Sequence, residues 1–251
     1  MKRGMYFAGA GAAGLLAAAV AVLAPHDDQP EAASEAPAPP RIVMAEGDDR
    51  LPSTTATDWV TYADHVVVVT AASERRLPVS ATEAARGEGL IGRTVDMQVK
   101  KVLWSRKGAP EAAPKSWTYN AAGFALTNGD PEAAAPMAVH GRPRMEVGHQ
   151  YIVAVSWEPA RCSPGDKPEP GRWMGLGEGS EVPYDGNTIG QGEMEGRVQT
   201  AAQARILVAG EHGLEEEMIG QDAAALAAKL KATPATEKQT FSAQSQPTAC
   251  D

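Results

Sequence analysis

The chain has 251 residues, a net charge of −9 and only two cysteines. The acidic balance argues against a nucleic-acid-binding protein, which usually carries a basic patch. Two cysteines are too few for a disulfide scaffold or a cysteine-rich metal site. The length allows one domain of ordinary size with extensions, or two small domains. The charge favours a soluble domain that stays monomeric through self-repulsion.

The amino terminus has the features of an export signal. Lys2 and Arg3 precede an uncharged, mostly apolar run, Gly4–Ala24, and a basic start before such a run is typical of a signal peptide. The run is about 20 residues, long enough to span a bilayer, and Pro25 should hinder cleavage after Ala24. We favour an uncleaved signal-anchor with residues 5–24 in the membrane; the alternative is a cleaved signal peptide, residues 1–24. Either way the rest of the chain lies outside the cytoplasm.

Two segments of low apolar content flank the expected domain. Residues 25–52 are rich in Pro, Ala and acidic side chains, so we expect a disordered linker that separates the domain from the membrane. Residues 233–251 are expected to form a disordered tail. The folded domain is therefore predicted over residues 53–232.

The segment Val66–Val69 is the centre of the predicted core. Four β-branched residues in a row favour a strand over a helix, and a short run that is apolar on both faces indicates a buried strand. We predict this strand from about Asp64 to Ala72. Thr57 or Asp58 is expected to cap a helical turn before it, and residues 74–89 are expected to be a loop.

The segment Arg93–Trp104 predicts a second strand, because apolar and polar residues alternate up to Val99. The alternation then slips at Lys100 and Lys101. One extra residue would restore it and place Val102 and Trp104 on the face of Val99, which predicts a β-bulge at Lys100 or Lys101. Further predicted elements are strands at Ser116–Asn120, Tyr151–Trp157 and Arg172–Leu176, and a helix at Asp222–Lys231 with one apolar face.

These elements predict a mainly β fold, a small OB-like closed β-barrel with a carboxy-terminal helix, preceded by the membrane or signal helix. The segments Ala63–Val69, Val95–Trp104 and Glu146–Val155 resemble bacterial secreted domains with the netrin-like OB-fold of the tissue inhibitors of metalloproteinases. The resemblance covers about residues 58–157 and implies the barrel fold. Those inhibitors ligate the protease zinc through a cysteine at the mature amino terminus. Here the first cysteine is Cys162, so the resemblance does not imply inhibition by that route.

The sequence contains no recognised catalytic motif. Its five histidines show neither His-x-x-x-His nor His-Glu-x-x-His spacing. Glu146 and His149 in one predicted turn form a carboxylate–histidine pair that a hydrolase could use, and a solvated turn is the alternative. Oxygen ligands suited to Ca²⁺ gather in a Gly-rich loop, where a plain solvated loop is again the alternative: Glu178, Glu181 and Asp185.

Two further sets of residues are candidates for binding and for a covalent link. Tryptophans can line a groove for a glycan or a peptide, or can instead close the core of a small barrel; they are Trp104, Trp117, Trp157 and Trp173. Cys162 and Cys250 would lie in an oxidising space, where a disulfide is allowed, and two unpaired thiols are the alternative.

An export signal, a spacer and a domain without a catalytic motif together predict a membrane-anchored or secreted extracytoplasmic binding module, with no enzyme activity and no cofactor. The expected partner is a cell-envelope protein or a glycan. An extracytoplasmic hydrolase that uses Glu146 and His149 is the alternative. A third possibility is a scaffold that binds protein through an open strand edge.

Overall fold

A computed structural model describes residues 41–47, 49–126, 129–162 and 168–239. The predicted signal or membrane segment and most of the predicted linker lie outside these residues. Among the helices that the structure describes, none is long and apolar enough to cross a membrane.

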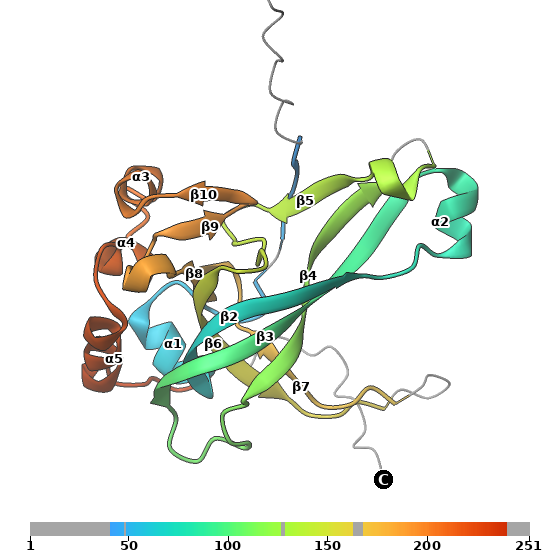
Figure 1. The fold of residues 1–251 in the computed structure, drawn as a ribbon. Coiled ribbons are helices and arrows are strands. Elements are labelled where there is room, and N and C mark those ends of the chain that lie inside the picture. Colours follow the sequence, from blue (N-terminus) through green and yellow to red (C-terminus); the bar gives the residue numbers. More distant parts are fainter. Residues whose placement is uncertain (1–40, 48, 127–128, 163–167, 240–251) are drawn as a thin grey trace, which may run out of the picture. The chain divides into compact units, whose positions relative to one another are not determined.

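The fold is mainly β with a carboxy-terminal helix, α5 (Ala223–Ala232), as predicted. The strands of the main sheet are antiparallel except for the parallel pair β1 and β5 (Figure 1). Their order in space is β1 (Val43–Ala45), β5 (Ala135–Val139), β4 (Ser116–Leu126), β3 (Gly89–Ser105), β2 (His65–Arg76), β6 (Gln150–Glu158) and β7 (Arg172–Gly175), and β8 (Glu181–Pro183) also pairs with β6.

The predicted closed barrel is not formed in the described part of the chain. The hydrogen-bonded path of strands ends at β1 and at β7. Strands β4 and β7 lie near each other, with Cα atoms within 8 Å at the closest approach, but no main-chain ladder joins them. The sheet therefore curls toward a barrel and stays open along the line between β4 and β7.

The valine run forms the centre of the core, as predicted. Val66 and Val68 contact one apolar cluster, while Val67 and Val69 contact another, and none of the four is more than 4% exposed. The first cluster lies between the sheet and α1 (Ala56–Tyr62) with α5, and the second lies inside the curl of the sheet. Both faces of β2 are covered, which is why its apolar residues are consecutive.

The predicted β-bulge is confirmed at Lys100. Val68 is paired with Lys101 and Val69 with Val99, so that Lys100 has no partner on β2. A second shift between Val66 and Val67 leaves out Leu103. Trp104 is consequently paired with Val66 and packs against the first cluster, so the prediction that it shares the face of Val99 is wrong.

Helix α1 begins two or three residues earlier than the sequence suggested. Thr55 is its N-cap, and the carboxylate of Asp58 accepts a hydrogen bond of 2.8 Å from the Thr55 amide. The Trp59 indole is 1% exposed and donates to the carbonyl of Ser53 at 2.6 Å. This fixes the chain before α1 against the core.

Two segments that were predicted to lack regular structure have it in part, and a third, the tail, is hydrogen-bonded to α1. The linker contains β1, which pairs with β5. The predicted loop at residues 74–89 contains the end of β2 and α2 (Ala81–Arg86). In the predicted tail, the amides of Thr236 and Gln239 donate to side chains of α1, and residues 240–251 lie outside the described part.

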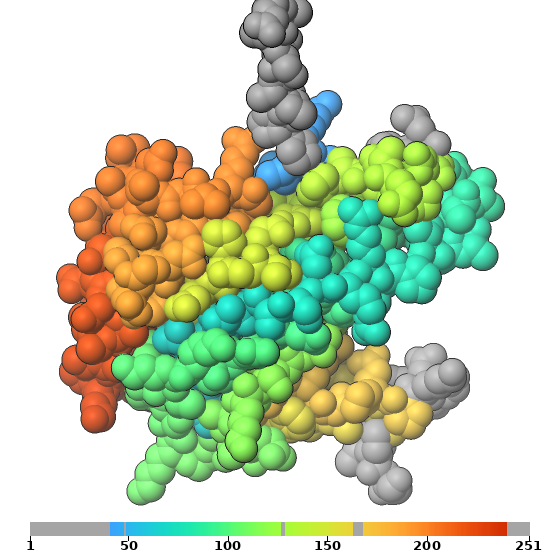
Figure 2. Space-filling model, in the orientation of Figure 1, coloured from blue at the N-terminus to red at the C-terminus, as the bar shows by residue number. Residues whose placement is uncertain are grey.

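The remaining elements pack beside the sheet. Figure 2 shows the orange and red carboxy-terminal part as a block against the cyan, green and yellow strands. Its elements are η2 (Glu178–Ser180), η3 (Asp185–Asn187), β9 (Gly192–Met194), β10 (Arg197–Gln199), α3 (Ala201–Leu207) and α4 (Leu214–Met218), and η1 (Pro131–Ala133) precedes β5.

Candidate ligand-binding cleft

A cleft of about 220 Å³ lies on the open line of the sheet, between β4 and β7. Consecutive residues of both strands line it. Because neighbouring side chains of a strand point to opposite faces, a run of consecutive lining residues means that the strand edges themselves face the cleft. The lining residues from the two strands are Thr118, Tyr119 and Asn120, and Arg172, Trp173, Met174 and Gly175.

The open edge of β7 carries the main-chain groups of Trp173. On β6, the carbonyl of Val155 accepts from Asp64 and the amide of Trp157 donates to Asp64, so both face β2. These two residues lie opposite Gly175 and Trp173 of β7, respectively. Because Val155 and Trp157 direct their main-chain groups toward β2, they form non-hydrogen-bonded pairs with Gly175 and Trp173. The N–H and C=O groups of Gly175 and Trp173 therefore point away from β6. In agreement, the Gly175 carbonyl accepts from Arg50 at 3.2 Å.

The open edge of β4 follows from the same alternation. The amide of Val99 on β3 donates to the carbonyl of Lys115 at 2.9 Å. In an antiparallel ladder the direction alternates along the strand, so Tyr119 faces β3 while Thr118 and Asn120 face the cleft. Two strand edges with unpaired main-chain groups therefore face each other in the described structure.

Arg50 places a positive charge at this cleft. Its guanidinium donates to the Ser156 hydroxyl at 2.6 Å and to the Gly175 carbonyl, and no carboxylate of the described residues lies within ion-pair distance of it. Desolvation lowers the pKa of Arg50, an effect that Glu158 opposes and that the charges of Arg161 and Arg172 reinforce. An anion bound here would relieve the repulsion among these arginines.

Arg142 lines the cleft from the segment before β6. It forms an ion pair of 2.8 Å with Glu181, whose side chain is fully buried, and donates to the hydroxyl of Tyr119 at 3.0 Å. Burial lowers the pKa of Arg142, but Glu181 and Tyr119 more than offset this and raise it. Burial raises the pKa of Tyr119 well above its usual range, and Glu181 adds to this. The Tyr119 hydroxyl therefore remains a hydrogen-bond donor.

Arg172 and Trp173 form the β7 wall. Arg172 donates to Glu158 at 2.9 Å, and Glu158 also pairs with Arg161. Trp173 contacts Trp157 edge to face, with ring centroids 5.2 Å apart. The cleft thus combines guanidinium groups with an apolar aromatic surface, a composition that is common in binding sites.

Of the four tryptophans predicted to line a groove, one lines this cleft. Trp173 lines the cleft, and Trp157 packs against the ring of Trp173 without lining the cleft itself. Trp104 and Trp117 instead pack against the two core clusters, which corresponds to the alternative of a core role.

Glu146 and His149 lie in one turn, as predicted, but bind different partners. Glu146 forms ion pairs with Arg144 and Arg93. The His149 ring nitrogen Nδ1 lies 2.5 Å from Asp185. The His149 amide donates to the Glu146 carbonyl at 3.3 Å, which closes the turn. No side-chain contact in the described structure joins the two residues, so they do not form one acid–base site.

The three predicted calcium ligands are dispersed as well. Glu181 binds Arg142, and Asp185 binds His149. Glu178 lies beside Asp49. Burial raises the pKa of Glu178, and the charge of Asp49 raises it further. Within residues 41–47, 49–126, 129–162 and 168–239, no group of three acidic, histidine or cysteine side chains is placed to hold a metal.

Cys162 is disulfide-bonded. Its predicted partner, Cys250, lies outside the described residues, so the pairing of these two cysteines stays a prediction.

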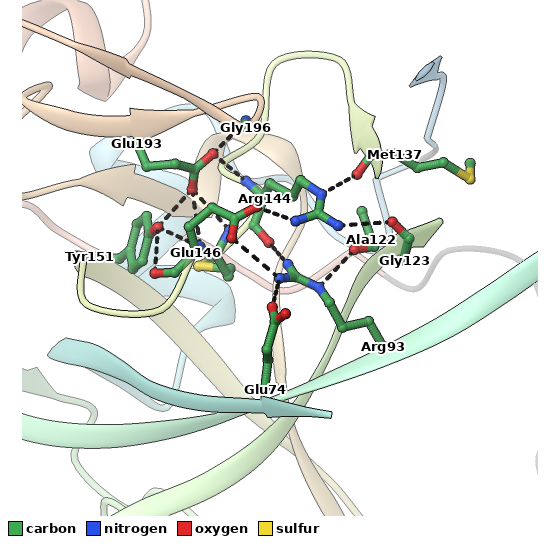
Figure 3. Close-up of polar contacts among 11 residues, drawn as sticks. Glu74, Arg93, Ala122, Gly123, Met137, Arg144, Glu146, Tyr151, Glu193 and Gly196 are labelled. Atoms are coloured by element: carbon green, nitrogen blue, oxygen red, sulfur yellow. Dashed lines mark hydrogen bonds and ion pairs between the residues drawn. The ribbon is translucent and has the colours of Figure 1, made fainter. Parts of the chain in front are cut away.

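A second polar cluster, centred on Arg93 and Arg144, is buried and has a structural role (Figure 3). Between Ile91 and Arg93, β4 has one more residue than β3, which forms a bulge at Ala122 and Gly123. The two arginines donate to the carbonyls of Ala122 and Gly123, each at 3.0 Å. They thus satisfy main-chain acceptors that the bulge removes from the ladder.

Glu193 completes the buried cluster (Figure 3). Its carboxylate accepts from the amides of Arg144, Met145 and Gly196 and from the hydroxyl of Tyr151, at 2.6–3.0 Å. Burial raises the pKa of Tyr151, and the adjacent Glu193 raises it further. This cluster fixes the turn before β6, and every guanidinium nitrogen of its two arginines already donates to an acceptor of the protein.

The arginines of the cleft were not predicted from the sequence. The only sequence signal was the adjacency of Arg172 and Trp173, a cation beside an aromatic residue in an acidic chain. A larger hollow of about 560 Å³ lies beside α2. Among its described lining residues, only Arg86 and Glu88 are charged, so it gathers no cluster of charged groups comparable to that of the cleft.

Comparisons of the chain with models of protein families, with curated protein sequences and with solved structures find no match. The resemblance to the netrin-like inhibitor fold therefore stays a prediction.

Proposed function

We propose that this protein is a non-enzymatic, extracytoplasmic binding module whose cleft between β4 and β7 holds an anionic group of its ligand. The observation that carries the proposal is the position of Arg50. Its guanidinium lines the cleft, close to the charges of Arg161 and Arg172, and forms no ion pair with a carboxylate of the described residues. An uncompensated cation in a concave, partly desolvated site favours an anion.

The proposed location outside the cytoplasm is supported by Lys2, Arg3 and the apolar run Gly4–Ala24. Amino-terminal sequencing of the mature protein, together with cell fractionation, tests it. A mature start at or after Pro25 would replace the membrane anchor with a cleaved signal peptide, and recovery of the protein in the cytoplasm would contradict export.

The alternative of a hydrolase has weaker support. A carboxylate–histidine mechanism requires both groups to reach one reacting atom, whereas Glu146 is bound by two arginines and His149 by Asp185. We therefore do not assign a catalytic role to this pair.

The binding proposal is tested by nuclear magnetic resonance titration of the full-length protein with sodium acetate and with inorganic phosphate. We expect saturable shifts of the Arg50 side chain and of the Trp173 indole, and at least a several-fold weakening in Arg50→Gln. The control is Arg197→Gln, which removes an exposed arginine of β10. The proposal fails if neither anion gives a saturable shift, or if both variants weaken binding equally.

A further inference from the structure

We infer that the ligand of this cleft is the carboxyl-terminal end of an extended polypeptide from a partner protein. This inference rests on the proposed function and specifies its ligand. The last residue would pair with the open edge of β7, and its α-carboxylate would bind Arg50.

The open strand edges favour a polypeptide. The N–H and C=O of Trp173 point out of the sheet, and those of Thr118 and Asn120 face them across the cleft, without main-chain partners in the described part. An extended peptide carries N–H and C=O groups at the spacing that such an edge can pair. A lone phosphate could meet Arg50 but would leave these main-chain groups unpaired.

The dimensions favour a chain end over a continuous segment. A strand inserted between two others requires about 9.5 Å between them, twice the usual strand spacing. The Cα atoms of β4 and β7 come within 8 Å of each other, so a chain cannot run through the whole gap. The cleft volume of about 220 Å³ is also below the range of about 300–1,000 Å³ that is usual for drug-sized ligands, and it suits a terminal residue that enters from one side.

The charges favour a free carboxylate at that end. Arg50 uses only one nitrogen, Nη2, in its contacts with Ser156 and Gly175. Its Nε and Nη1 make no hydrogen bond within the described part of the chain, and a guanidinium can bind a carboxylate with two nitrogens at once. The ring of Trp173 supplies an apolar surface for the last side chain.

The test compares two peptides that differ only at the carboxyl end. The probe is an octapeptide of Val and Thr with fluorescein on its amino terminus, made as the free acid and as the carboxamide. Its affinity for the full-length protein is measured by fluorescence polarisation. We expect the free acid to bind about 10-fold more tightly or better, as one charge-assisted hydrogen-bond pair predicts. Arg50→Gln should abolish this preference, and Arg197→Gln should keep it.

Hydrogen exchange of the complex provides a second readout. Binding of the free acid should slow exchange of the Trp173 amide, and N-methylation of the penultimate peptide bond should weaken binding. Equal affinity of acid and amide, or a preference that Arg50→Gln does not change, would overturn the inference. If acetate binds through Arg50 but the peptide shows no preference, the proposed function stands and this inference fails. Tighter, Arg50-dependent binding of a sulfated oligosaccharide would likewise replace the peptide with a glycan.

Discussion

The hydroxyl of Tyr119 on β4 donates a hydrogen bond of 2.5 Å to the carboxylate of Glu181 on β8. This bond joins the two sides of the open line of the sheet through side chains, where a closed barrel would have a main-chain ladder. Arg142 bonds to both residues. The sheet is therefore held in its curled form while the edges of β4 and β7 remain available.

Substitutions in this side-chain bridge should affect stability to different degrees. Tyr119→Phe removes two hydrogen bonds, the one donated to Glu181 and the one accepted from Arg142, but it leaves Glu181 paired with Arg142. We therefore expect a loss of about 1–3 kcal/mol in the free energy of unfolding. Arg142→Met leaves the buried Glu181 carboxylate without its cation and should cost about 3–5 kcal/mol. Urea unfolding measures both. Equal losses in the two variants would show that the bridge does not depend on charge compensation.

The buried carboxylate of Glu193 should be essential for stability. In Glu193→Gln an amide NH₂ replaces an oxygen that accepts from main-chain amides, and we expect a loss of about 3 kcal/mol or more. Glu195→Gln is the matched control, because the Glu195 side chain is 31% exposed and, among the described residues, binds only His140 and the Gly141 amide. Thermal unfolding of the two variants makes the comparison. A similar loss in both would contradict the role assigned to Glu193.

The stability of the protein should fall as the pH rises through the weakly acidic range. Burial, with a smaller contribution from Glu211, raises the pKa of Glu215 from 4.5 to about 7, and its Oε1 is buried without a hydrogen bond in the described part. Between pH 4.5 and 7 the folded state retains a proton that the unfolded state has lost. The contribution of Glu215 to the free energy of unfolding is therefore fully present below pH 4.5. It decreases as the pH rises, and about 3 kcal/mol of it is lost once the pH passes 7.

Glu215→Gln should remove this decline, which is measured by unfolding at a series of pH values. Glu216→Gln on the same helix is the control. Hydrogen bonds from the Gly210 and His212 amides lower the pKa of Glu216, so its contribution has the opposite sign and is lost as the pH falls. A decline that persists in Glu215→Gln would show that another group causes it.

The bulge in β4 should not tolerate a side chain at Gly123. A Cβ atom there would lie 1.9 Å from the carbonyl oxygen of Ile91, so Gly123→Ala must displace the main chain of β3 or β4. We expect a loss of about 3 kcal/mol or more in denaturant unfolding. Gly213→Ala should cost much less, because its Cβ would lie 3.2 Å from the nearest atom and its φ is −95°.

The sequence alone determined the features that depend on neighbouring residues. The run Val66–Val69 required a buried strand, because it is apolar on both faces. The interrupted alternation of apolar and polar residues after Val99 predicted the bulge that lies at Lys100. The capping residue Asp222 and the apolar face of the residues after it predicted α5. The predicted cap of α1, Thr57 or Asp58, was wrong because Thr55 is the N-cap and forms a capping box with Asp58. Several residues between Thr54 and Asp58 can cap a helix, so the local sequence does not decide among them.

Only the tertiary structure decided the cleft. Of its residues, the sequence pointed to Trp173 alone. Arg50 contacts Gly175 across 125 positions, and Tyr119 contacts Glu181 across 62. The period of apolar residues records which face of a strand is buried. It does not record which strands become neighbours, and a bulge or a side-chain bridge can keep two strand edges apart that a regular barrel would join.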